Sequence, residues 1–188
     1  MTLLSMKSSF LHFSALVALA SSGFFQPLLL ATVPVALDVA TVRAKMSEAK
    51  NLAKANNVAG AEQVLLTLNR AKPNTAGWHM ETAQRLMGTA EQLAREARPA
   101  SIAPLTASAL SHLAQADTLT TDARIRAAAK TLAGFIHERY LADRKSALAS
   151  FQSAALLSPT TATSAKEAAD RLQKTEDKAR AKVNPTGK

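Results

Sequence analysis

Apolar residues recur at steps of three and four positions along most of the chain, which is the period of an amphipathic helix. The clearest stripe begins at Trp78 and passes through Leu86 and Leu93. No segment alternates apolar and polar residues with a period of two, so the pattern predicts no strands. We therefore predict an all-α protein with about seven helices, over residues 42–53, 61–68, 78–97, 101–116, 121–140, 143–155 and 164–182.

Capping and breaking residues separate these predicted helices. We expect Asn74 or Thr75 to begin the long third helix and Ser101 to begin the fourth, because their side chains can accept from the first free amides. Asp122 supplies negative charge to the first turn of the fifth helix, where the helix dipole favours it. Pro99 prevents the third helix from continuing.

The amino terminus has the pattern of a targeting segment. Its only charged residue before position 38 is Lys7, which precedes an apolar run that ends in the small-x-small sequence Ala18-Leu19-Ala20. Residues 1–36 are therefore predicted to be a bacterial-type signal peptide, cleaved after Ala20 or near Ala36 or Ala40. We expect the protein to be exported, either to the periplasm or out of the cell.

A retained anchor is the alternative, because a second apolar stretch follows the first at once. Residues 8–36 would then hold the protein in the inner membrane. Pro27 and Pro34 interrupt this stretch, whereas a good spanning helix needs about 20 predominantly apolar residues. In either case we expect a helical domain over residues 37–183 and a disordered tail over residues 184–188.

Composition narrows the possible functions of this 188-residue chain. It contains no cysteine, which excludes disulfides, thiol catalysis and a lipid anchor on an amino-terminal cysteine. The net charge is +9, but basic and acidic residues alternate along every segment, which is typical of solvated helix faces. We expect weak attraction to anionic membrane surfaces and no nucleic-acid binding, since no arginine-rich face with interleaved aromatic residues is present.

The predicted helices form pairs whose ends are almost evenly spaced, which is the sign of a repeat protein. The third pair carries Ala147-x3-Phe151-x2-Ala154-x4-Pro159, with Gly134 in the Leu-Ala-Gly sequence of its first helix. The first pair repeats the pattern with Ala49, Leu52, Ala61, Leu65 and Pro73. These positions resemble the tetratricopeptide repeat, although the spacing from Gly134 to Ala147 is one residue longer than in that family. The resemblance implies a right-handed stack of helical hairpins, a tetratricopeptide-like α-solenoid.

Sites for chemistry are not evident in the sequence. His137-Glu138 lacks the second histidine of a zinc-protease helix, because position 141 is leucine. His79 and His112 lie on different predicted helices without ligand spacing, and we interpret them as satisfied or exposed histidines. We therefore predict no catalytic residues, no metal site and no cofactor; an enzyme would need a cleft that gathers His79, His112 and His137.

Trp78 and Tyr140 are the candidate partner-binding residues, because amphipathic aromatic side chains are frequent in binding hot spots. Ordinary core packing is the alternative for both. The predicted function is that of an exported, non-enzymatic helical-repeat scaffold that binds an unknown protein of the cell envelope. The alternative is a structural helical bundle that self-associates into a homo-oligomer, or a membrane-tethered subunit.

Overall fold

The computed structural model describes residues 38–183, with side chains described as far as residue 179. Seven α-helices and one 3-10 turn occupy this part of the chain: α2 (Val39–Lys54), α3 (Val58–Leu66), α4 (Ala76–Arg95), η2 (Pro99–Ser101), α5 (Ile102–Thr118), α6 (Ala123–Arg139), α7 (Arg144–Leu157) and α8 (Thr163–Val183). Residues 38–183 contain no strand, so the all-α prediction is confirmed for them.

Side chains with short polar groups begin most of these helices. Asp38, Asn57, Thr75, Asp122 and Asp143 each accept a hydrogen bond from a backbone amide in the first turn of the helix that follows. Asp122 is therefore the cap of α6. The sequence had suggested that it lies within the first turn, and this prediction is wrong. A local side chain thus satisfies a backbone group at the start of each of these helices.

Ser101 corrects a second prediction. It lies immediately before α5, but its side chain makes no capping hydrogen bond, because its backbone is already helical within the 3-10 turn that starts at Pro99. The preceding helix ends at Arg95, two residues earlier than predicted, and Ala97 adopts a left-handed φ of 54°. The Arg98 amide bonds to the Leu93 carbonyl across this turn, which closes the end of α4.

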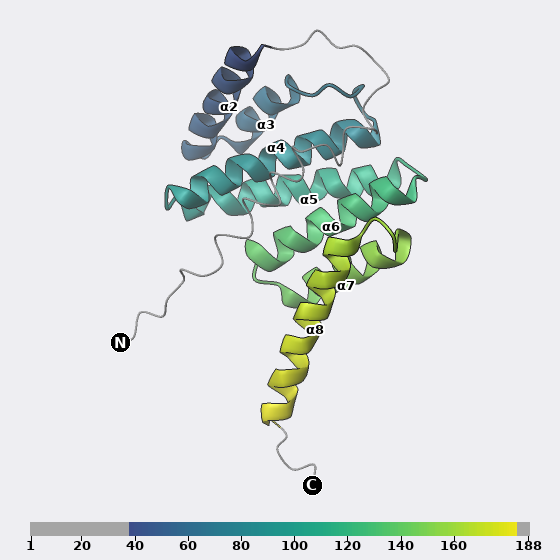
Figure 1. Cartoon of the computed structure of the whole chain (residues 1–188). Coiled ribbons are helices and arrows are strands. Elements are labelled where there is room, and N and C mark those ends of the chain that lie inside the picture. The colour runs from purple at the N-terminus through teal and green to yellow at the C-terminus, as the bar shows by residue number, and fades with distance from the viewer. Residues whose placement is uncertain (1–37, 184–188) are drawn as a thin grey trace, which may run out of the picture. The chain divides into compact units, whose positions relative to one another are not determined.

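Consecutive helices pack against each other in the order of the chain, and they alternate in direction (Figure 1). The closest pairs are α2 with α3, α4 with α5, and α6 with α7, while α8 packs on α7. Further contacts join α2 to α4, α4 to α6 and α6 to α8. Each hairpin therefore touches the next one.

Alanine and leucine fill the core at these helix crossings. In the first four helices the fully buried members include Ala49, Ala61, Leu65, Leu86 and Leu93. Small alanines let helix backbones approach closely, which explains why so few large side chains suffice.

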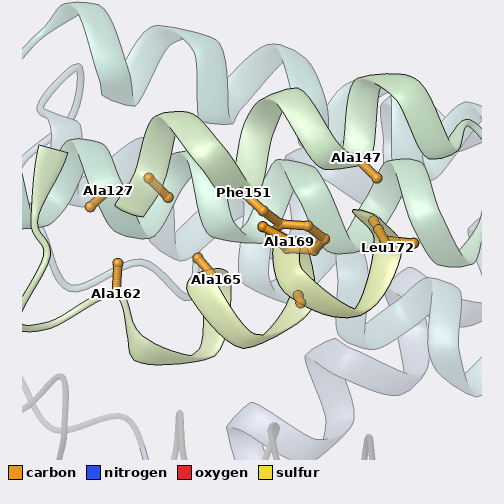
Figure 2. Close-up of a cluster of buried hydrophobic side chains, with 9 residues drawn as sticks. Ala127, Ala147, Phe151, Ala162, Ala165, Ala169 and Leu172 are labelled. Carbon is orange, nitrogen blue, oxygen red and sulfur yellow. The ribbon is translucent and has the colours of Figure 1, made fainter. Parts of the chain in front are cut away.

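A second cluster holds α6, α7 and α8 together (Figure 2). Phe151 is its largest member and is fully buried. It packs edge-on to Phe135, with ring centroids 5.0 Å apart. Its other buried members are Ala127, Ala147, Ala154, Ala162, Ala165, Ala168, Ala169 and Leu172. No residue of α8 beyond Leu172 is buried among those whose side chains are described, so only the first part of this helix is held by apolar packing.

Ion pairs add polar links between neighbouring hairpins. Lys50 and Lys54 of α2 reach Glu96 at the end of α4, at 3.0 and 2.5 Å. From the end of α5, Asp117 pairs with Arg126 and Lys130 of α6, at 2.9 and 2.7 Å. These links run between helices that the apolar contacts already bring together.

Three predictions fall outside the described residues. The signal peptide or anchor over residues 1–36, with its cleavage sites after Ala20 and near Ala36, and the tail over residues 184–188 are not described by the structure. The third cleavage site, near Ala40, lies within the first turn of α2. Among the helices of residues 38–183, none is long and apolar enough to cross a membrane.

Candidate functional site

The most unusual polar feature in the described part of the chain is a pair of histidines between α4 and α5. His79 lies four positions before Ala83, and His112 lies three positions after Ala109, so both occupy the buried stripes of their helices. Only 4% of His79 and 7% of His112 is exposed. The histidines are therefore brought together by the same periodicity that packs the two helices.

The two imidazoles bond directly to each other and continue into a carboxylate. The Nδ1 atoms of His79 and His112 are 2.7 Å apart, and the Nε2 atom of His112 is 3.2 Å from Oε1 of Glu62. Ser108 donates to the other carboxylate oxygen of Glu62. Because Glu62 belongs to α3 and the other three residues to α4 and α5, this chain of hydrogen bonds joins the first hairpin to the second.

Trp78 covers the histidine pair. Its ring meets those of His79 and His112 edge-on, with centroids 4.9 and 5.9 Å apart. Burial lowers the pKa of His79 below its usual 6.5, because the charged imidazolium loses hydration, and the nearby His112 lowers it further. The pair is thus shielded by an aromatic side chain and favours a neutral His79.

A neighbouring network fixes the irregular connection between α3 and α4. Asn69 donates to the Trp78 carbonyl and to the Thr82 hydroxyl, at 3.1 and 2.6 Å, and it accepts from Arg85 at 3.2 Å. The buried Glu81 accepts from the backbone amide of residue 70 at 2.6 Å. These contacts hold the start of α4, and with it Trp78, in one position.

Tyr140, the second candidate partner-binding residue, does not lie beside Trp78. It follows the end of α6 and is half-buried; burial raises the pKa of its hydroxyl to about 12, with a further contribution from Glu91 near the end of α4. Trp78 and Glu91 are thirteen positions apart on α4, or about 20 Å at 1.5 Å per residue. The two aromatic residues therefore belong to opposite ends of this helix, and a role in binding stays a prediction for each.

His137 is separate from the other two histidines. It faces Asp143 at the turn into α7, with Nδ1 3.8 Å from Oδ2, and this buried atom has no hydrogen-bond partner. The structure thus gathers His79 and His112 but not His137.

The arrangement can hold and transfer a proton through its hydrogen bonds. In residues 38–183 no three His, Cys, Asp or Glu side chains come together as metal ligands. A hollow of about 460 Å³ is lined by Glu167, Asp170, Arg171, Lys174, Thr175 and Lys178 of α8, and it contains neither histidine.

Sequence reasoning missed Glu62, whose partner lies fifty positions away on another helix. A signal was nevertheless present, since both histidines fall on apolar stripes and a buried imidazole needs a hydrogen-bond partner. Glu62 follows the buried Ala61 and is the only charged residue of α3. No protein-family model, curated protein or solved structure matches this chain.

Proposed function

We propose that this protein is an exported, non-enzymatic scaffold whose stacked helical hairpins bind another protein of the cell envelope. The observation that supports this most directly is the order of the helix contacts. Each hairpin touches the next through α2 and α4, α4 and α6, and α6 and α8. Repeat proteins of the tetratricopeptide kind stack their hairpins in this serial manner into a right-handed solenoid. They bind partners on the surface that the stack forms.

The proposed binding side is the one that carries the connections before α4, after α5 and after α7, on the right of Figure 1. Trp78 lies just inside the first of these, Leu119 in the second and Leu156 just before the third. Leu119 is 51% exposed and Leu156 is 83% exposed. Large apolar residues at a rim of connections are suited to contact a partner.

Capture from an envelope extract tests this proposal, with the full-length protein as bait and with a Leu119→Ser, Leu156→Ser double variant beside it. Both positions are exposed, so the variant should fold normally. We expect the wild type to retain one discrete protein and the variant to lose it. Leu141→Ser is the matched control, because this exposed leucine lies at the opposite connection, between α6 and α7.

Size-exclusion chromatography with light scattering separates the proposal from its alternative. A scaffold for another protein should elute at the mass of one chain. A species whose mass grows with concentration, and that captures nothing else, would contradict the proposal and favour a self-associating helical bundle.

A further inference from the structure

The hydrogen-bond chain from Glu62 to His79 has a fixed direction. A carboxylate can only accept, so Glu62 requires protons on Ser108 and on Nε2 of His112. A neutral His112 then presents a lone pair at Nδ1, and the Nδ1 atom of His79 must donate to it. One carboxylate therefore determines the tautomers of both imidazoles.

This chain has room for one further proton. Nε2 of His79 has no hydrogen-bond partner among the described residues, and it is not sealed from solvent. A proton added there leaves the Nδ1 hydrogen of His79 in place, so every bond of the chain survives. The resulting positive charge lies at the other end of the chain from the negative Glu62.

A second proton does not fit on the two imidazoles. It would have to bind Nδ1 of His112, where two N–H groups would then face each other across 2.7 Å. Both rings are more than nine-tenths buried, so water cannot separate the two charges while the helices stay packed. Relief requires that α4 and α5 move apart or that one ring rotates out of the interface.

Few other charged groups face the pair. Glu62 of α3 bonds to His112, and Ser108 of α5, which is uncharged, bonds to Glu62. On α4 itself, Trp78 covers the rings, while Glu81 and Arg85 turn to the connection between α3 and α4, where they bond to backbone groups. No ion pair joins α2 to the pair within residues 38–179; its lysines pair with Glu48 and Glu96.

We propose that Glu62, His112 and His79 form a pH-sensitive clamp that joins the first hairpin to the second at neutral pH and opens in acid. The first proton, on Nε2 of His79, keeps the chain of bonds but already costs stability, because burial and then His112 lower the pKa of His79 in the folded state. The second proton, which has no place on the paired imidazoles, is the one that opens the clamp. The unfolded chain takes up a proton near pH 6.5, before the folded chain does. Stability is therefore complete above about pH 6.5 and falls as the pH decreases below it. This device does not depend on the proposed scaffold function.

The tautomers can be read directly in the full-length protein by nitrogen-15 NMR of the imidazole rings, assigned through bonds. At neutral pH we expect His112 to carry its proton on Nε2 and His79 on Nδ1. The opposite assignment, or fast averaging between tautomers at both residues, would overturn the proposal without any need for a variant.

Urea unfolding from pH 7.5 to pH 5 tests the clamp itself. The unfolding equilibrium constant of the wild type should rise about tenfold for each pKa unit by which folding lowers the pKa of His79. His79→Gln should lose this part of the pH dependence, while His137→Gln, which alters a histidine outside the chain, should retain it. Equal pH dependence in the wild type and in His79→Gln would overturn the proposal.

Discussion

The close approach of α6 and α7 depends on Gly134, and adding a single methyl group there is a sharp test of the packing. A Cβ atom at this position would lie 2.6, 2.7 and 2.9 Å from three ring atoms of Phe151. That ring is fully buried and is packed against Phe135, so it cannot turn away into solvent. Gly134→Ala must therefore push the two helices apart or distort the ring's position.

The magnitude follows from two opposing terms. Alanine in a helix interior is favoured over glycine by about 0.5–1 kcal/mol, because glycine loses more backbone entropy on folding. Overpacking of a well-filled core costs about 1–3 kcal/mol. Gly88 supplies a matched control, since it also lies inside a helix and nothing would lie within 4 Å of an added Cβ.

Urea denaturation of the two single variants measures the difference. Gly88→Ala should be more stable than the wild type, and Gly134→Ala should have an unfolding free energy about 1–3 kcal/mol below that of Gly88→Ala. The helix-propensity term cancels in this comparison, so the gap isolates the clash with Phe151. If both variants are stabilised equally, the packing of α6 on α7 described here is wrong.

Three further substitutions test separate contacts. Asp117→Asn should cost about 1 kcal/mol at neutral pH, because it breaks partly exposed pairs with Arg126 and Lys130. Burial raises the pKa of Asp117, but the bonds from Lys130 and Arg126 lower it more. The stability that Asp117 contributes should therefore be present above about pH 4 and vanish as the pH falls further. Acid titration of the wild type and of Asp117→Asn measures this difference. Asn69→Ala should cost about 1–3 kcal/mol in thermal unfolding, since it removes three hydrogen bonds that hold the start of α4; an unchanged melting temperature would contradict that role. Ala97→Gly should stabilise the protein by up to about 1 kcal/mol in calorimetry, because glycine adopts the left-handed φ of 54° without strain; a loss of stability would show that this turn has a different backbone.

The helices were predictable because their signals are local. Thr75 caps α4 at a position that the sequence indicated, and the apolar stripe of α4 is buried at Leu86 and Leu93. A local effect also explains why the capping prediction for Ser101 is wrong. Ser101 stands at the expected place but does not cap, since the 3-10 turn after Pro99 sets its backbone first.

The chain of His79, His112 and Glu62 was not predictable from spacing, because its three residues come from three helices. Periodicity places His79 and His112 on buried faces, but only the crossing of α4 on α5 decides that their Nδ1 atoms meet. The link to Glu62 depends in turn on how α3 lies against α5. Gly134 and Phe151 are intermediate: both were singled out by the repeat pattern, and the structure places them in contact.

The side of the protein with Leu119 and Leu156 is proposed to bind a different protein. Site-specific photo-crosslinking in intact cells tests this binding, with a benzophenone side chain placed at position 156 of the full-length protein and, as a control, at position 141. We predict one discrete adduct with another envelope protein from position 156 and none from position 141. Adducts only with a second copy of this chain, or the same adducts from both positions, would show that this side does not bind a different protein.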